Sequence, residues 1–146
     1  MVAVGEAAPD FEALDQDGTP FRLSSLRGSP VVLYFYPKAD TPGCTIEAQG
    51  FAKDFGEYRA KKVHVVGVST DSCKDQKAFA KKYGLPFTLV ADDDRKVAEK
   101  YGVLSREHGV ASRISFFLDP QGKVLEIVKG SPDLHLTKAR SRFLQA

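Results

Sequence analysis

The sequence predicts an α/β protein in which a mixed central sheet carries helices on both faces and a β-hairpin precedes it. Residues 31–36 form a continuous apolar run of β-branched and aromatic residues, as in a strand buried on both faces, and the valine-rich segment 63–69 predicts a second buried strand. A long helical segment separates these runs, and such a connection joins parallel strands. Two later apolar runs flank a Gly-containing turn at residues 119–122, which predicts an antiparallel hairpin and makes the sheet mixed.

The N-terminal third of the chain supplies the first of these elements. Asp-Gln-Asp-Gly at residues 15–18 is a turn signal between two short runs of strand character, so it predicts a hairpin. Ile46, Phe51, Phe55 and Tyr58 recur at helical spacing and predict an apolar stripe on the long helix. The elements expected here are strands at 11–14, 20–23 and 31–36, one helical turn at 24–28, and a helix at 41–61.

The rest of the chain alternates helices with strands. Gly84 follows a run of helical character and is a typical C-terminal helix residue. Acidic residues open the next helical segment, and Gly102 closes it. The elements expected after residue 62 are strands at 63–69, 87–90, 113–118 and 124–128, and helices at 73–83, 92–101 and 132–144. This order is that of a thioredoxin-like fold with an N-terminal addition.

Length and composition describe an ordinary globular protein, which we expect to form a single domain over residues 1–146. A net charge of +2 is too small to indicate nucleic acid or an acidic membrane as a partner. No apolar run approaches the roughly 20 residues of a membrane span. The first residues lack a basic segment followed by an apolar one, so we expect no signal peptide and a cytoplasmic protein.

One cysteine falls at a predicted helix start. Pro37 ends the first buried strand, and Thr41 is a good N-cap residue, followed by Pro42 at the first helical position. Cys44 is then the third helical residue, and the Thr41 hydroxyl is expected to accept a hydrogen bond from its N–H. A thiol at the positive end of a helix dipole, beside unpaired backbone donors, is favoured as the nucleophilic thiolate.

The second cysteine follows the second buried strand in the equivalent place. Because parallel strands end at the same edge of a sheet, Cys44 and Cys73 are expected at one edge. Two cysteines are too few for a disulfide scaffold. The three histidines share no ligand spacing with them, so no zinc site is predicted, and His108 and His135 are expected at the surface. Asp71 and the acids at 92–94 are interpreted as caps and solvated loop residues.

The motif Pro37-x-x-x-Thr41-x-x-Cys44 resembles the active-site motif of the peroxiredoxin family. The string from Tyr36 to Ala48 is similar to the branch called bacterioferritin comigratory protein, or peroxiredoxin Q. The resemblance covers nearly the whole chain and includes the segments at 5–11, 67–69 and 113–122.

The resemblance implies a thiol-dependent peroxidase that reduces hydrogen peroxide and organic hydroperoxides without a cofactor or metal. Cys44 would be the peroxidatic residue, with Pro37 shaping its pocket. Arg113 matches the family's arginine from a late strand. A thiolate attacks one peroxide oxygen, and the site must stabilise charge along the O–O axis. The implied substrate-binding residues are Thr41, Gly43, Glu47 and Arg113.

The chain departs from the family at the resolving cysteine. Many members of this branch carry it five residues after the peroxidatic one, where this chain has Gln49. Cys73 is the remaining candidate, and we expect an intramolecular disulfide with Cys44 after partial unwinding of the first helix, eased by Gly43 and Gly50. A 1-Cys mechanism is the alternative. The resemblance implies regeneration by thioredoxin or a similar dithiol protein, and we expect a monomer.

Three other functions compete with this reading. A thiol–disulfide oxidoreductase on the same fold would need Cys-x-x-Cys at the helix start, where this chain has Thr41 as the first of the two. A glutathione-peroxidase-type enzyme would need a tryptophan, and the chain has none. A catalytically silent interaction module would leave Cys44 without a reaction.

Overall fold

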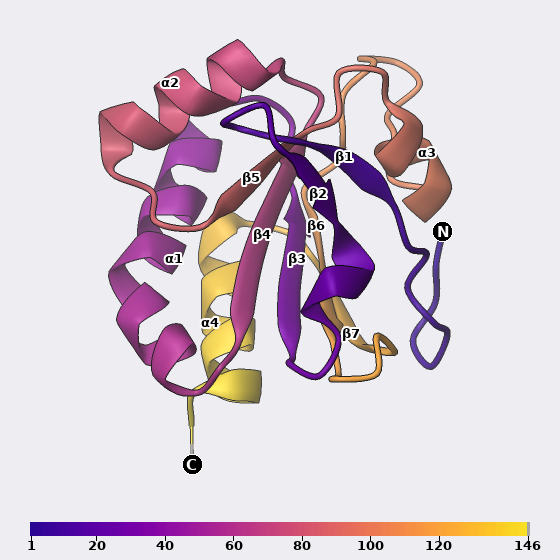
Figure 1. The fold of residues 1–146 in the computed structure, drawn as a ribbon, viewed down its shortest axis with the longest axis vertical. Coiled ribbons are helices and arrows are strands. Elements are labelled where there is room, and N and C mark those ends of the chain that lie inside the picture. Colours follow the sequence, from indigo (N-terminus) through magenta and orange to yellow (C-terminus); the bar gives the residue numbers. More distant parts are fainter. Residues whose placement is uncertain (146) are drawn as a thin grey trace.

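Seven strands form one sheet at the centre of the described residues, which are 1–145: β1 (Glu12–Asp15), β2 (Pro20–Arg22), β3 (Val31–Phe35), β4 (His64–Ser69), β5 (Thr88–Ala91), β6 (Ile114–Leu118) and β7 (Val124–Lys129). In this computed structural model the strand order is β2-β1-β5-β4-β3-β6-β7 (Figure 1). Strands β3, β4 and β5 run parallel to one another. The other pairings are antiparallel, so the predicted mixed sheet is confirmed.

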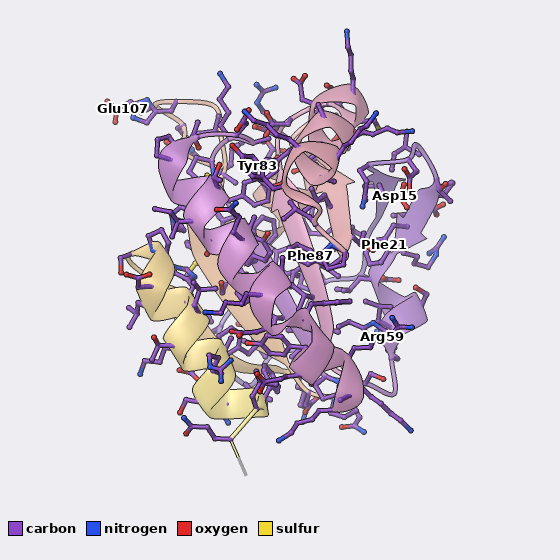
Figure 2. The ribbon with its side chains drawn as sticks, turned by 90° about the vertical axis from the view of Figure 1, so that its left-hand side faces the viewer. Asp15, Phe21, Arg59, Tyr83, Phe87 and Glu107 are labelled. Carbon is purple, nitrogen blue, oxygen red and sulfur yellow. The ribbon has the colours of Figure 1, made fainter. Side chains whose placement is uncertain are left out.

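Helices cover both faces of the sheet, as predicted: η1 (Leu23–Leu26), α1 (Pro42–Ala60), α2 (Cys73–Tyr83), α3 (Lys96–Tyr101) and α4 (Pro132–Phe143). Helices α1, α2 and α4 lie on one face, and α3 with η1 lies on the other (Figure 1). Figure 2 shows α1 and α4 running side by side across their face. None of these helices is long and apolar enough to span a lipid bilayer.

The continuous apolar run of β3 reflects burial on both sides. Val31, Leu33 and Phe35 face the core under α3, whereas Val32 and Tyr34 face the core under α1 and α4. Successive side chains of a strand point to opposite faces, so a strand covered on both faces cannot alternate apolar and polar residues. This places β3 at the centre of the molecule and the end of β3 at the start of α1.

The predicted element boundaries hold within a residue or two, with one larger exception. Helix α2 has the predicted bounds and ends at Gly84, which adopts the left-handed conformation with φ 60°. Helix α3 starts at Lys96 and not at residue 92. The reason is Asp92, which is buried and accepts hydrogen bonds from the N–H groups of Val97 and Ala98, so residues 92–95 form a turn that caps the helix.

The predicted apolar stripe on α1 was wrong at Ile46, which is 53% exposed. The buried face instead runs through Cys44, Ala48, Phe51 and Tyr58. These residues follow one another at spacings of four, three and seven, which keeps them on one side of a helix, and Ile46 lies on the other side. The corrected stripe begins at the cysteine, so the same face that packs α1 against the sheet buries its thiol.

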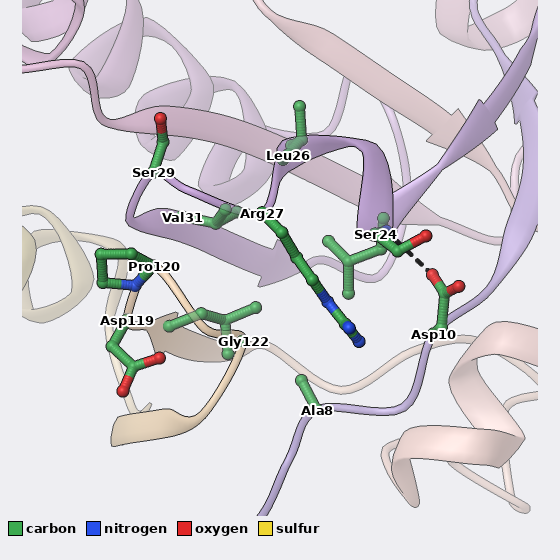
Figure 3. A pocket seen from close by; sticks show the side chains of 12 residues that line it. Ala8, Asp10, Ser24, Leu26, Arg27, Ser29, Val31, Asp119, Pro120 and Gly122 are labelled. Carbon is green, nitrogen blue, oxygen red and sulfur yellow. Dashed lines mark hydrogen bonds between the residues drawn. The ribbon is translucent and has the colours of Figure 1, made fainter.

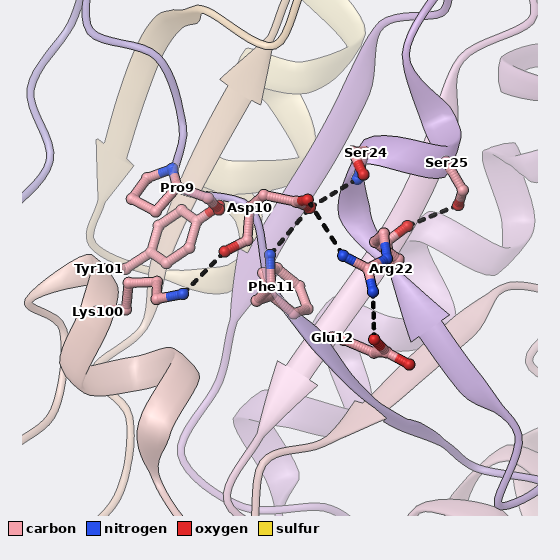
Figure 4. A network of polar contacts seen from close by, with 9 residues as sticks. All are labelled: Pro9, Asp10, Phe11, Glu12, Arg22, Ser24, Ser25, Lys100 and Tyr101. Carbon is pink, nitrogen blue, oxygen red and sulfur yellow. Dashed lines mark hydrogen bonds and ion pairs between the residues drawn. The ribbon is translucent and has the colours of Figure 1, made fainter.

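The N-terminal segment is fastened to the α3 side of the sheet by a polar network (Figure 4). The Asp10 carboxylate accepts hydrogen bonds from the N–H groups of Phe11 and Ser24 and lies 3.9 Å from Arg22. Lys100 donates to the carbonyl oxygen of Asp10, and the Tyr101 hydroxyl donates to that of Pro9. The hairpin of β1 and β2 therefore extends the sheet on the edge away from β6.

A small hollow lies at the end of the sheet opposite to Cys44. Its apolar wall includes Val31, the first residue of β3, and the Arg27 side chain stretches across it (Figure 3). Cys44 follows the other end of β3, so this hollow is separate from the site described below.

The close packing of α1 on α4 depends on the absence of a side chain at Gly50. A Cβ atom built there lies 2.8 Å from Leu136 Cδ2 and 3.1 Å from Leu136 Cγ, so the whole leucine side chain would have to move. We expect Gly50→Ala to lower the free energy of unfolding by about 1–3 kcal/mol, as overpacking does. Gly56→Ala is the matched control, because nothing lies within 4 Å of its Cβ position. It should raise stability by about 0.5–1 kcal/mol through helix propensity. Urea unfolding of both variants measures the difference, and equal effects would contradict the packing argument.

Candidate active site

Cys44 lies in the first turn of α1, directly after the loop that leaves β3. Pro42 is the first helical residue, as predicted, and the first N–H bonded across the turn is that of Thr45, to Thr41 O at 2.8 Å. The earlier N–H groups of a helix have no partner within it. Cys44 is 1% exposed and packs among the residues of the α1 face. Its sulfur is therefore held in a largely dry site at a helix N-terminus.

The predicted cap by Thr41 was wrong, although Thr41 does occupy the N-cap position. Its hydroxyl donates a 2.7 Å hydrogen bond to the carbonyl oxygen of Lys38 and makes no cap bond to the helix. The hydroxyl therefore bonds back to a carbonyl three residues earlier in its own loop and not forward to the helix. The Thr41 oxygen keeps its lone pairs and can accept a hydrogen bond.

Arg113 contacts the cysteine sulfur, although 69 residues separate them in sequence. Its Nη2 donates to Cys44 Sγ at 3.3 Å, and its Nη1 donates to Glu47 Oε1 at 2.7 Å. Arg113 immediately precedes β6, and β6 pairs with β3 so that Ile114 lies opposite Phe35. The antiparallel pairing thus brings the start of β6 to the end of β3. The structure brings together three residues predicted for the site.

The electrostatic balance of this group rests on burial. Burial opposes the charge of Arg113, but its bonds to Cys44 and Glu47 outweigh this effect and raise the guanidinium pKa. Burial also raises the pKa of Glu47 to about 7, against the attraction of Arg113. Arginine stays protonated under all these conditions, so it presents a fixed positive charge to the sulfur.

The sequence analysis placed His135 at the surface, and this was wrong. His135 of α4 is fully buried, with Nδ1 3.5 Å from Glu47 Oε2 and 2.7 Å from Ser115 Oγ. Burial lowers the pKa of His135 to about 4. A signal was present in the sequence, because His135 and the buried Ala139 are four residues apart on the face of α4 that contacts the sheet.

The two cysteines start helices that follow neighbouring parallel strands, with Phe35 of β3 opposite Val68 of β4. Both thiols are free, and Cys73 is half-buried. The two intervening loops are joined, because the Ala39 N–H donates to Asp71 Oδ2 at 2.8 Å. The topology therefore agrees with the prediction that both cysteines lie at one edge of the sheet.

The loop before Cys44 is also fastened to the end of α2. Asp40, which has a positive φ of 60°, accepts hydrogen bonds from the Tyr83 hydroxyl at 2.7 Å and from Lys82 Nζ at 2.9 Å. Pro37 is half-buried in this loop. Gly43 follows it in the first turn of α1, where a Cβ atom would lie 2.9 Å from Arg113 Nη2. A glycine at this position gives the guanidinium room beside the sulfur.

The described residues contain no group of three or more His, Cys, Asp or Glu side chains that could hold a metal ion. The reactive group of the site is the Cys44 sulfur at a helix N-terminus. The Arg113 guanidinium lies beside it and also donates a hydrogen bond to the buried Glu47 carboxylate. A thiolate in this setting is a nucleophile whose neighbours can stabilise charge on an attacked oxygen.

Comparison with known proteins gives consistent matches. A family profile described as "AhpC/TSA family" matches residues 4–127. A curated relative, "Peroxiredoxin Q, chloroplastic" of Triticum aestivum, is 42% identical over 92% of this chain, and the chain spans 64% of that relative's length. The crystal structure of peroxidoxin BcpB from Mycobacterium tuberculosis matches with a TM-score of 0.91 and 36% identity over 100% of both chains. A Xanthomonas campestris structure titled for the alkyl peroxide reduction activity of bacterioferritin comigratory protein matches with a TM-score of 0.84 and 29% identity, over 91% of this chain and 89% of that one.

The position of Gly43 gives a test that separates activity from stability. We expect Gly43→Ala to displace the Arg113 guanidinium from Cys44 Sγ and to slow the reaction of the thiol with peroxide by roughly 10- to 100-fold, as loss of one charge-stabilising donor does. The free energy of unfolding should hold or rise by up to about 1 kcal/mol, because alanine favours the helix. Stopped-flow kinetics and urea unfolding measure the two effects, with Gly56→Ala as the control. A slow variant that is also strongly destabilised would contradict the local displacement.

Proposed function

We propose that this chain, which belongs to the AhpC/TSA family, is a thiol-dependent peroxidase that reduces hydrogen peroxide and small organic hydroperoxides through Cys44. The observation that carries the proposal is the contact of Arg113 Nη2 with Cys44 Sγ at the start of α1. An inert buried cysteine does not need a charged donor on its sulfur, and an arginine is desolvated only where it has partners. The Xanthomonas relative, whose title names alkyl peroxide reduction, supports the inclusion of organic hydroperoxides.

The reaction uses the groups of this site in fixed roles. The Cys44 thiolate attacks one peroxide oxygen, an S–O bond forms, the O–O bond breaks, and hydroxide or alkoxide leaves and takes a proton from water. Cys44 becomes a sulfenic acid. Arg113 and the free N–H groups of the first turn stabilise the charge spread over the two oxygens. The Thr41 hydroxyl donates its hydrogen bond to the carbonyl oxygen of Lys38, so its oxygen is free to accept a hydrogen bond from the O–H of the peroxide.

Pro37 and Gly43 shape the approach to the sulfur. Pro37 lies in the loop that covers the start of α1, and it shields the thiolate from water. Gly43 leaves the space beside Arg113 open, and Glu47 holds the guanidinium in place through its 2.7 Å bond. This arrangement orients donors before the peroxide arrives.

We infer that Cys73 resolves the sulfenic acid within one chain. The Cys73 thiol attacks the Cys44 sulfur, a disulfide forms and water leaves. A disulfide needs Cα atoms about 4.4–6.8 Å apart, and we expect the first turn of α1 to unwind so that Cys44 and Cys73 can meet this limit. Gly43 and Gly50 ease this motion, and the bond between the two loops keeps the helix starts together. Thioredoxin or a similar dithiol protein then reduces the disulfide, and the enzyme works as a monomer.

The peroxidase proposal predicts a fast first turnover. We expect the wild-type protein to consume one equivalent of hydrogen peroxide at least 1,000-fold faster than a free thiol, on the order of the 4 kcal/mol that such charge stabilisation supplies. Cys44→Ser should abolish this consumption. Stopped-flow measurements with peroxide test it, and insulin reduction is the control for thiol–disulfide exchange. A wild-type rate equal to that of a free thiol would end the proposal, and insulin reduction without peroxide consumption would favour an oxidoreductase.

The resolving role of Cys73 has its own test. After one equivalent of peroxide, we expect mass spectrometry to find a Cys44–Cys73 disulfide in the wild-type protein. Cys73→Ser should keep a sulfenic acid at Cys44 that dimedone traps, and it should lose turnover with thioredoxin by more than about 10-fold, because no thiol of the chain can then resolve it. A lasting sulfenic acid in the wild type, or a Cys44–Cys44 dimer, would show that Cys73 is not the resolving residue.

A further inference from the structure

A buried polar chain continues past Arg113 into the centre of the protein. Glu47 uses Oε1 to accept the hydrogen bond from Arg113, and its Oε2 lies 3.5 Å from His135 Nδ1. Both Glu47 and His135 are fully buried. Within residues 1–145, Oε2 finds no hydrogen-bond donor as the side chains stand. A buried carboxylate oxygen without a donor is energetically unfavourable, so a proton at or near Glu47 Oε2 would stabilise this arrangement.

The contacts of the His135 ring indicate which of its nitrogens carries a hydrogen and which has a lone pair. Nε2 lies 3.2 Å from the carbonyl oxygen of Gly130, which can only accept, so Nε2 carries a hydrogen. In a neutral ring Nδ1 then has a single lone pair, with Ser115 Oγ 2.7 Å and Glu47 Oε2 3.5 Å away. An ionised Glu47 would turn its own lone pairs toward this nitrogen. One proton shared by Oε2 and Nδ1 removes the repulsion: on Nδ1 it can be donated to both oxygens, and on Oε2 it neutralises the carboxylate while the Ser115 hydroxyl donates to Nδ1.

The same proton balances the charges around the sulfur. A Cys44 thiolate, the Arg113 guanidinium and an ionised Glu47 add up to one negative charge when His135 is neutral. With one more proton on the Glu47–His135 pair, the sum is zero. Charges interact strongly in a buried site, so the neutral sum favours the thiolate, and the negative sum opposes it.

The groups that surround the pair do not change this count. From β3, Tyr34 faces Glu47, and burial raises the pKa of its phenol well above the ordinary value, so it stays neutral. Between α1 and α4, Asp54 and Arg140 form their own ion pair at 2.7 Å. From β6, Ser115 brings only a hydroxyl, and the remaining charges of α4 that flank His135, Asp133 and Lys138, are exposed.

We propose that His135 is a positioning residue, which shares one buried proton with Glu47 and so leaves the full charge of Arg113 to pair with the Cys44 thiolate. The inference rests on the proposed function, since it assigns His135 a part in preparing the peroxidatic sulfur. The directions of the two shifted groups agree with it, because burial raises the pKa of Glu47 to about 7 and lowers that of His135 to about 4, which favours the proton on the carboxyl group. His135 itself touches neither the sulfur nor the substrate.

The test measures ionisation of Cys44 without peroxide, by thiolate absorbance against pH in a Cys73→Ser background. His135→Asn places an amide N–H near the Nδ1 position, so Glu47 gains a hydrogen-bond donor and can stay ionised. The total charge of Cys44 thiolate, Arg113 and Glu47 then stays negative. We expect the midpoint of thiolate formation to rise by about one to two pH units, from the added charge at this distance in a partly buried site. The pH profile of the peroxide reaction should shift by the same amount. His64→Asn, on an exposed histidine of β4, is the matched control and should leave both unchanged.

A second substitution distinguishes charge from damage to the fold. Adding Glu47→Gln to His135→Asn removes the negative charge while keeping an acceptor for Arg113, so the midpoint should return toward that of the wild type. A midpoint of His135→Asn within 0.3 pH units of the wild type, on the order of the error of such titrations, would overturn the inference. A double variant with a higher midpoint than the single one would also overturn it. A slow wild-type reaction with peroxide would instead end the proposed function, and the titrations would still decide on His135.

Unfolding measurements cover the case in which His135→Asn does not fold. Because the pKa of Glu47 is raised in the folded protein, the folded state binds its proton more tightly than the unfolded state. The contribution of Glu47 to the free energy of unfolding should therefore be largest below about pH 4.5, and it should fall as the pH rises toward 7. Glu47→Gln should remove this fall. The same pH dependence in wild type and variant would show that Glu47 holds no buried proton, and the inference would be wrong.

Discussion

The contact of one guanidinium with one sulfur is the interaction on which the arrangement of the active site depends. Arg113 holds Cys44 Sγ with one nitrogen and Glu47 with the other, and both partners lie on the same face of α1. Desolvating an arginine is unfavourable unless its donors are used, so the contact persists only while α1 keeps this face toward the sheet. The buried stripe of α1 provides that orientation. The packing of the helix and the charge at the sulfur are thus one arrangement.

The sheet sets the distance between the two ends of this contact. Strand β6 runs antiparallel to β3, so its first residue lies at the end of β3 where the active-site loop begins. A shift of one residue in this register would turn the alternating side chains of β6 to the opposite faces. The aromatic residues of the strand fix the register, because Phe116 belongs to the core under α3 and Phe117 to the core under α1 and α4. Arg113 is therefore placed by hydrophobic residues further along β6.

Local patterns in the sequence predicted most of the fold and the centre of the site. The two-sided burial of β3, the bounds of α2 and the helix start at Pro42 followed from residues close together in the chain. The errors had different causes. Thr41 has the residue type and position of a cap, but its hydroxyl donates to a carbonyl three residues earlier in its own loop. His135 reads as a surface residue until α4 lies against α1, where Glu47 and Ser115 become its neighbours. Arg113 was assigned through resemblance, and the register of β6 supplies its physical reason.

In the proposed mechanism, the reduced site and a Cys44–Cys73 disulfide exclude each other. The donors around Cys44 exist only while the first turn of α1 is wound, and the proposed disulfide with Cys73 at the start of α2 would need that turn to open. The loop before the helix cannot move freely, because Asp40 is held by α2 and Ala39 by the loop before Cys73. Opening therefore has to occur within α1 itself, on the helix side of these anchors. Opening would separate the Cys44 sulfur from Arg113 only after the thiolate has become a sulfenic acid. At that stage the sulfur carries no charge for Arg113 to stabilise, so losing the contact is least unfavourable.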